Sequence, residues 1–183
     1  MSSLAVRYRV QTDLPDGPSG ELLGEPGMKQ RGFSLIELLI VVAIILVIAA
    51  IAIPNLLRAK MAANEASAVS SIGAINTAQV AYSVAYVGYA DNLAKLGAPA
   101  SGPTNANNAG LLDWVLGCAA QPCPKSGYNF NILNATGAPV VAYDVTGVPQ
   151  VLGRTGTRGF CSDKMNPLLV DMSGGTNCTV PLQ

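Results

Sequence analysis

Glu37 is the residue of this sequence whose chemistry most needs an explanation. It is the one charged residue between Phe33 and Ile53, a run made mostly of Leu, Ile, Val and Ala. As a helix this run spans roughly 32 Å at about 1.5 Å per residue, which matches the apolar core of a bilayer. A carboxylate inside a membrane helix is costly and normally pairs with a cation. Because the run contains no basic residue, we expect the partner of Glu37 to come from elsewhere.

Cleavage of the chain between Gly32 and Phe33 would supply such a cation. The new α-amino group would lie four residues before Glu37, and positions i and i+4 are neighbours in a helix. A neighbouring copy of the chain offers the same amine. Gly32 has no side chain, so an extended backbone there can enter a narrow protease cleft. Such a cut would turn Glu37 into a residue that assists assembly.

The residue types present argue against most enzymes. The chain has no His, which removes the usual general base, the commonest nitrogen ligand of metals and any Ser/His/Asp triad. It contains neither G-x-S-x-G nor a Gly-rich phosphate loop. Its formal net charge is +0, so it lacks the basic surface of a nucleic-acid-binding protein. We expect no enzyme activity, no cofactor and no metal; calcium among Asp144, Asp163 and Asp171 is the less favoured alternative.

The run that carries Glu37 is predicted to be a membrane anchor. A cleaved secretory signal is the alternative, since Ala49–Ala52 has the small residues of a cleavage site, but such signals usually have shorter apolar cores. Lys29 and Arg31 precede the run and favour a cytoplasmic N-terminus.

Pro54 follows the run directly. It removes one helical hydrogen bond and clashes with the carbonyl of Ala50, which predicts a kink or local unwinding between these residues. A helix end after the membrane is the alternative. Beyond Pro54 the apolar spacing predicts an amphipathic helix over 54–87, with Glu65 and Gln79 as polar breaks in its apolar stripe. The stripe consists of Met61, Ala68, Ile72, Ile75, Tyr82 and Tyr86. A second face has small residues that would let another element approach closely: Ala62, Ala66, Val69 and Gly73.

The remaining sequence predicts a connecting loop followed by strands. Residues 88–127 are rich in Asn, Gly, Ala and Pro, and within them LLDWVL predicts one helical turn that buries Trp114 as a core plug. A receptor-binding role for Trp114 is the alternative. Tyr128–Leu133 and Val140–Val145 have strand character around a turn, and a third strand is expected near Gly159–Ser162 or Leu168–Val170. The fold class is α+β, a long N-terminal helix on a small antiparallel sheet.

The segment from Lys29 to Leu57, KQRGFSLIELLIVVAII followed by LVIAAIAIPNLL, resembles the N-terminus of a type IV prepilin. Its Gly, Phe, Glu and Pro all fall at the spacings of that family. The resemblance implies that prepilin peptidase cuts after Gly32 and N-methylates Phe33. It further implies that Glu37 docks the subunit into a filament, and that Pro54 takes the place of the helix-breaking proline of the family.

The leader implied by this cut, residues 1–32, is longer than the usual type IVa leader. A start at Met28 gives the ordinary leader Met-Lys-Gln-Arg-Gly, and the codons of Gly24 and Glu25 can spell a ribosome-binding site before it. We interpret residues 1–27 as a misassigned start. A true long leader, as in type IVb-like prepilins, is the alternative.

The four cysteines fit a domain outside the cytoplasm, where an even count favours disulfides. Three connectivities are open. We favour Cys118–Cys123 as a local clasp and Cys161–Cys178, which is similar to the disulfide-bounded C-terminal loop of many pilins and falls within residues 128–183. Zinc is disfavoured because there is no His.

The expected function is that of a structural subunit of a type IV pilus, used for adhesion, motility or DNA uptake. Before assembly the chain would cross the inner membrane once, with its folded part in the periplasm; afterwards it would be extracellular. Expected partners are further copies, prepilin peptidase, the inner-membrane assembly machinery and the bilayer. The alternatives are a minor pilin or a pseudopilin of a type II secretion system. The pseudopilin is less favoured because a D-P-W-G-like stretch is absent.

Overall fold

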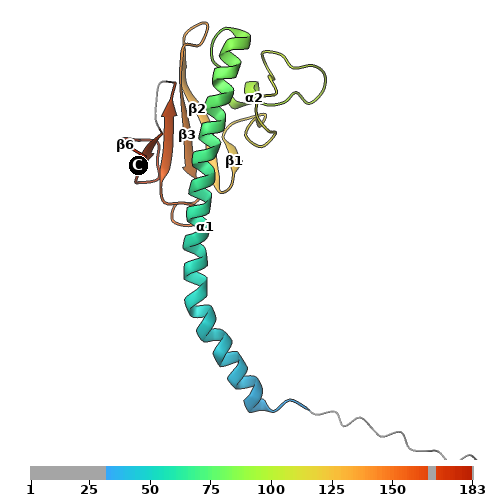
Figure 1. Ribbon diagram of the computed structural model, residues 1–183, viewed down its shortest axis with the longest axis vertical. Helices are drawn as coiled ribbons and strands as arrows, with labels where there is room; N and C mark the ends of the chain where they lie inside the picture. Colours follow the sequence, from blue (N-terminus) through green and yellow to red (C-terminus); the bar gives the residue numbers. More distant parts are fainter. Residues whose placement is uncertain (1–31, 165–167, 183) are drawn as a thin grey trace, which may run out of the picture. The chain divides into compact units, whose positions relative to one another are not determined.

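The computed structural model describes residues 32–164 and 168–182, in two units that divide after Val42. The expected leader 1–31 and the expected start at Met28 lie outside the described residues. Figure 1 shows the elements in chain order. They are α1 (Leu35–Tyr86), α2 (Leu93–Leu96), β1 (Cys123–Lys125), β2 (Tyr128–Thr136), β3 (Ala142–Pro149), β4 (Gly159–Asp163), β5 (Leu169–Asp171) and β6 (Val180–Pro181). We call residues 87–182 the head.

Helix α1 is a single element of 52 residues that continues through Pro54. The predicted local unwinding is therefore absent, and the alternative of a helix end there is wrong. Pro54 removes only one of the many hydrogen bonds of a long helix. The side chain of Asn55 donates to the carbonyl of Ile51 at 3.2 Å, which adds a local bond beside the proline. A bend at Pro54 stays a prediction.

The end of α1 depends on a backbone conformation that few residues adopt. Val87 and Gly88 have φ values of 56° and 113°, in the left-handed region. A Cβ atom on Gly88 would lie 2.8 Å from the Cβ of Pro139, so a larger residue would push the β2–β3 turn away. The next amide, Tyr89 N–H, donates to the carbonyl of Val140 at 2.9 Å. The chain therefore leaves α1 directly against the sheet.

The six strands form one antiparallel sheet in which each strand pairs with its sequence neighbours. Both sites proposed for a third strand are strands, β4 and β5, and the α+β fold class is confirmed. Strand β2 extends to Thr136 through an irregularity after Leu133, so the turn comes later than predicted. The edge strands β1 and β6 were not predicted; both are very short, and each contains a proline.

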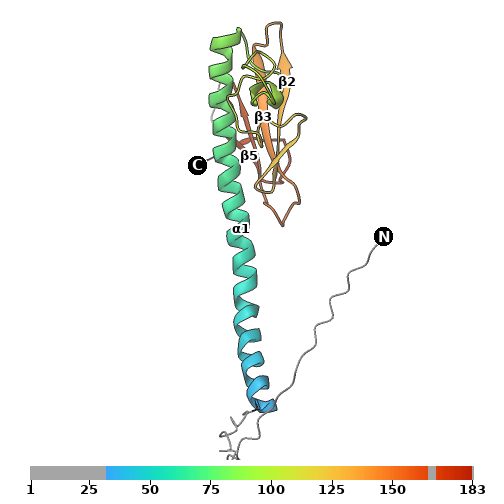
Figure 2. The same cartoon turned by 90° about the vertical axis from the view of Figure 1, so that its right-hand side faces the viewer.

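The core lies between one face of the sheet and the C-terminal half of α1. Figure 2 shows the strands along one side of this part of the helix. In β2 alternate residues from Tyr128 to Ile132 are buried, as expected for a strand with one covered face. The largest fully buried side chains from helix, loop and sheet are Ile72, Ile75, Gln79, Leu93, Leu96, Leu116, Tyr128, Phe130, Ile132, Val145 and Phe160. The small face expected to receive another element is open at Gly73, where a Cβ would have nothing within 4 Å, whereas Val69 packs against the core of the head.

The prediction that Trp114 plugs the core is wrong. Its side chain is 82% exposed, whereas Leu112 and Leu116 are 8% and 2% exposed. Residues 112 and 116 lie four apart and share one side of the turn, so the residue between them points away. Asp113 fixes this turn by accepting the Leu116 N–H at 2.8 Å.

Candidate functional site: the N-terminal segment of α1 and its attachment to the head

The predicted cleavage site is extended and open. Gly32 and Phe33 precede α1 in non-helical backbone. A Cβ on Gly32 would meet no atom within 4 Å, and Phe33 is 79% exposed. Nothing in the described part of the chain therefore covers the peptide bond between them. An enzyme that binds extended backbone has access to this bond; cleavage itself stays a prediction.

Glu37 lies in the first turn of α1. The N–H of Leu38 donates to the carbonyl of Ser34 at 3.1 Å, which closes the first turn. Phe33 lies before the helix, so the helical i, i+4 arrangement with Glu37 is not formed in this uncut chain. Within residues 32–164 and 168–182, Glu37 forms no ion pair. The unpaired N–H groups of a helix start favour a carboxylate here.

The residues that follow Glu37 present a continuous apolar surface. By length and composition α1 is able to cross a membrane, and its most apolar window has a mean hydropathy of 3.3 with none of that window buried. Exposed apolar surface of this extent marks a site for lipid or for other protein. Its large apolar side chains are Leu38, Leu39, Ile40, Val41, Val42, Ile44, Ile45, Leu46, Val47, Ile48, Ile51, Ile53, Leu56 and Leu57.

Glu65 ties α1 to the loop between β3 and β4. Its Oε2 accepts two bonds from Arg158, at 2.9 and 2.7 Å, and its Oε1 accepts the N–H and the hydroxyl of Thr157, both at 2.9 Å. Burial raises the pKa of Glu65, but the hydrogen bonds from Thr157 and Arg158 outweigh it, so the pKa is lowered overall. Glu65 is therefore an attachment point and not the polar break that its position in the stripe predicted.

Gln79 makes a second attachment, to the segment that follows α1. Its side chain donates to the carbonyl of Ala90 at 2.9 Å and accepts the N–H of the same residue at 2.8 Å. Both residues are fully buried. Gln79 was also predicted as a polar break. The signal that could have identified both attachments is a polar residue placed where helical spacing requires burial.

Two disulfides close loops of the head: Cys118–Cys123 and Cys161–Cys178, the two pairs favoured from the sequence. In the second loop Asp171 accepts bonds from the N–H and hydroxyl of Ser173, at 2.7 and 2.6 Å, and these bonds lower its pKa. It also accepts the N–H of Asn177 at 2.9 Å. Nowhere in the described ranges do three His, Cys, Asp or Glu side chains gather closely enough for a metal, which leaves the calcium alternative without structural support.

Comparison with known proteins gives matches at the N-terminal segment and beyond it. Residues 27–53 match the family described as the prokaryotic N-terminal methylation motif. The type IV major pilin protein PilA of Myxococcus xanthus is 35% identical over 123 residues, which cover 67% of this chain and 49% of that protein. The chain thus spans about half the length of this relative.

Two further relatives match shorter stretches. The type IV wide pilus major component PilA4 of Thermus thermophilus is 42% identical over 66 residues, 36% of this chain and 50% of that protein. The type II secretion system core protein G of Pectobacterium carotovorum is 40% identical over 55 residues, 30% of this chain and 35% of that protein. No solved structure matches significantly.

Proposed function

We propose that this chain, a type IV pilin by its methylation motif, its relatives and its fold, is the repeating subunit of a surface filament. It is a structural subunit and not an enzyme. The observation that carries the proposal is Glu37, which lies at the start of a fully exposed apolar helix directly after an open Gly32–Phe33 bond. Cleavage followed by packing among copies of the chain gives all three features a use together.

Before assembly, the apolar half of α1 holds the chain in the inner membrane with the head in the periplasm. Prepilin peptidase removes residues 1–32 on the cytoplasmic side and methylates the amine of Phe33. The new terminus is a cation at the membrane surface, where the cost of a charge is lower than at the bilayer centre. The chain is then ready for transfer from lipid to protein by the assembly machinery.

In the filament, the apolar side chains of α1 exchange lipid for the helices of neighbouring copies. Glu37 enters this apolar interior only with a partner, because an unpaired buried carboxylate is strongly unfavourable. The amine of Phe33 on a neighbouring copy is a partner of opposite charge that every subunit supplies. The pairing therefore fixes the axial position of each subunit as well as satisfying the carboxylate.

A subunit of a type II secretion system is the second candidate, since protein G of that system matches 55 residues of the chain. The length of the matches favours the pilus. The match to the major pilin extends over 67% of the chain, well beyond the methylation motif.

The test of the assembly role is Glu37→Ala. We expect the variant chain to be cut after Gly32 and to accumulate in the membrane, while surface filaments fall by at least about tenfold, as a pairing worth more than about 1.4 kcal/mol requires. The readouts are the N-terminal peptide by mass spectrometry and sheared filaments by electron microscopy. Asp91→Asn is the matched control, because Asp91 is an acidic residue of the head paired to Lys95 at 2.9 Å. Normal filaments with Glu37→Ala would refute the role of this carboxylate.

A further inference from the structure

The loop between β3 and β4, residues 150–158, presents apolar side chains at its tip. Val151 and Leu152 are 48% and 60% exposed. The tip lies against α1 just after its apolar run, and together they line a shallow groove of about 300 Å³. The groove residues are Leu57, Lys60, Met61, Val151, Gly153, Arg154 and Thr155. Val151 and Leu152 lie next to each other beside the end of the apolar part of α1, and they extend the exposed apolar surface that marks a site for lipid or for protein.

The tip is held in place by α1. The side chain of Asn64 donates to the carbonyl of Thr155 at 2.8 Å. Thr155 in turn accepts the N–H of Val151 at 3.0 Å, and Arg158 pairs with Glu65 at 2.7 Å. The exposed aliphatic side chains are therefore presented in a fixed position beside the helix, and they do not need to be ordered when a partner binds.

Positively charged side chains lie on α1 and on the loop, next to this groove. Arg58 and Lys60 on α1 and Arg154 on the loop form no ion pair within the described ranges. Between Leu38 and Asn64, and within residues 150–158, the sequence has no carboxylate. Glu65, the next acid along α1, is already bound to Arg158. We call Arg58, Lys60, Val151, Leu152 and Arg154 the collar.

We propose that the collar docks the head onto the anionic phosphates of phospholipid headgroups while the chain is stored in the membrane. This inference rests on the proposed membrane anchorage of α1. Leu56 and Leu57 are the last large apolar residues of α1 before the basic residues, and Lys60 lies about 5 Å beyond Leu57 along the helix axis. Each headgroup layer of a bilayer is about 5–8 Å thick, which places the charges of the collar among the phosphates. Val151 and Leu152 then face the boundary between headgroups and acyl chains.

Lipid fits the collar better than a second copy of the chain does. Lys60 and Arg58 lie two positions apart on α1 and so on different faces of the helix, whereas one protein neighbour covers one face. Lipid headgroups surround the helix on all sides. The head also offers few acids for pairing, since Asp91 and Asp113 are bound to Lys95 and Lys125 at 2.9 and 3.0 Å. Basic and aliphatic side chains together are the usual composition of an interfacial lipid contact.

The test places a fluorescent reporter in the collar of the full chain. Trp114 is the sole Trp, so Trp114→Phe with Leu152→Trp leaves one reporter at the loop tip. The chain is reconstituted into vesicles of phosphatidylethanolamine and phosphatidylglycerol, with phospholipid brominated near the headgroup end of its acyl chains as quencher. We expect a blue-shifted emission that the brominated lipid quenches. Native Trp114, in the unsubstituted chain, should remain unquenched.

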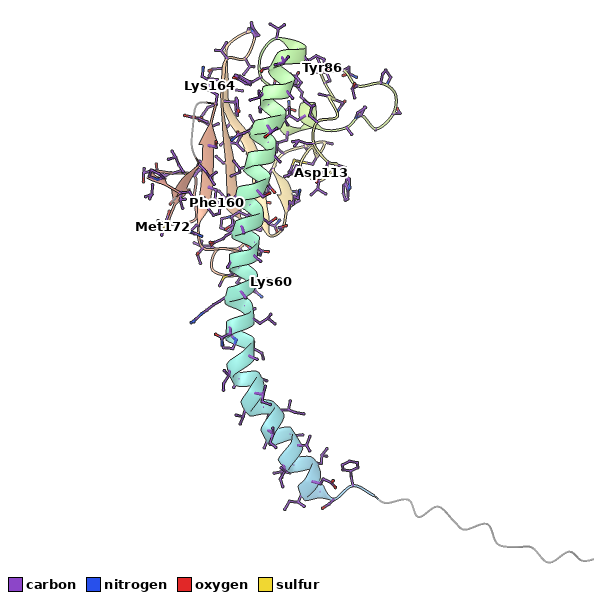
Figure 3. All side chains as sticks on the ribbon, viewed as in Figure 1. Lys60, Tyr86, Asp113, Phe160, Lys164 and Met172 are labelled. Carbon is purple, nitrogen blue, oxygen red and sulfur yellow. A yellow bond between two sulfur atoms is a disulfide. The ribbon has the colours of Figure 1, made fainter. Side chains whose placement is uncertain are left out.

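Charge reversal tests the role of the basic residues. Arg58→Glu, Lys60→Glu and Arg154→Glu together should reduce the quenching of the reporter at least about fivefold, since each charge at an anionic surface is worth roughly that factor. The matched control is Lys164→Glu. Figure 3 shows Lys60 on α1 beyond one end of the sheet and Lys164 near the other end, so the control should leave quenching unchanged.

Flotation of the chain with the vesicles tests membrane anchorage, and quenching of the reporter tests docking of the collar. Flotation of the chain with the vesicles, together with an unquenched reporter, would overturn docking while anchorage holds. Absence of flotation would overturn both. Equal quenching in the charge-reversed variant would overturn recognition of the phosphates. A blue shift that bromine does not quench and that grows with the protein-to-lipid ratio would assign the collar to a second copy, which also overturns the proposal.

Discussion

The two halves of α1 both carry many aliphatic residues, but these are exposed in the first half, whereas those that face the sheet are buried in the second. In the first half Ile44, Ile48 and Ile51 are between 55% and 66% exposed, whereas in the second half Ile72 and Ile75 are 0% exposed. The second half finds its partner in the sheet of the same chain. The first half has none among the described residues. One helix thus serves two separate tasks, and stability of the head should depend on only one of them.

Substitution of matched isoleucines tests this division most directly. Ile72→Ala should lower the free energy of unfolding of the head by about 2–5 kcal/mol, because it leaves a cavity in a packed core. Ile48→Ala should change it by less than about 0.5 kcal/mol. Both variants are compared as full chains in the same detergent, with melting followed by near-ultraviolet circular dichroism of the Tyr residues. An equal loss for the two would show that the halves are not independent.

The next effect concerns Glu65, which fastens the second half to the head. Glu65→Gln should cost about 2 kcal/mol, because Arg158 keeps its partly buried charge but loses its partner. The pKa of Glu65 is lowered in the folded chain, so its contribution is fully present above the ordinary glutamate pKa of about 4.3. The contribution is lost as the pH falls from there through the lower folded value.

The measurement for Glu65 is the midpoint of thermal unfolding between pH 3 and pH 7. The difference between the native chain and Glu65→Gln should shrink towards the acid end. Asp91→Asn is the control, since its pair with Lys95 is partly exposed and should contribute less than about 1 kcal/mol. A constant difference across the range would contradict the assigned ionisation of Glu65.

The smallest effect on stability is expected at Trp114, a large apolar residue of the head. Its side chain is exposed, like the apolar side chains in the first half of α1. Trp114→Phe should leave the midpoint of thermal unfolding almost unchanged, within about 0.5 kcal/mol, because the indole contributes little to the core. Leu116→Ala, two residues further, is the buried counterpart and should cost at least about 2 kcal/mol. A marked loss of stability with Trp114→Phe would restore the core role that its sequence context predicted.

Sequence patterns were sufficient to predict the helices and strands whose apolar residues recur at a regular spacing. The apolar run and the stripe through Ile72 and Ile75 indicated α1, and alternation in Tyr128–Leu133 indicated β2. Sequence patterns failed where a contact with another segment of the chain determines the local structure. Strand β1 exists because Cys123–Lys125 pairs with β2, and three residues carry no periodicity of their own. Trp114 was misplaced because composition does not tell which side of a turn faces the core.

The polar attachments show the same limit at the level of single side chains. Glu65 and Gln79 interrupt an apolar stripe, and the sequence alone does not say whether such residues face water. Their partners lie outside α1: Arg158 is in the loop between β3 and β4, and Ala90 follows the end of the helix. The apolar stripe of α1 therefore gives no information about them. The N-terminal residues Gly32, Phe33 and Glu37 are the reverse case. Their spacing and the resemblance it carries led to the proposal, because the proposed cut and the proposed neighbour are not part of a single folded chain.

The prolines in both edge strands limit hydrogen-bonded pairing between the sheets of different molecules. Pro124 lies in β1 and Pro181 in β6, so each outer strand lacks an amide donor. Open sheet edges are templates for intermolecular pairing, and short strands with proline block that pairing. If copies of the chain pack side by side as proposed, these edges keep them from joining sheet to sheet. The proposed contacts then run through the helices, and amyloid-like pairing is blocked at both edges of the sheet.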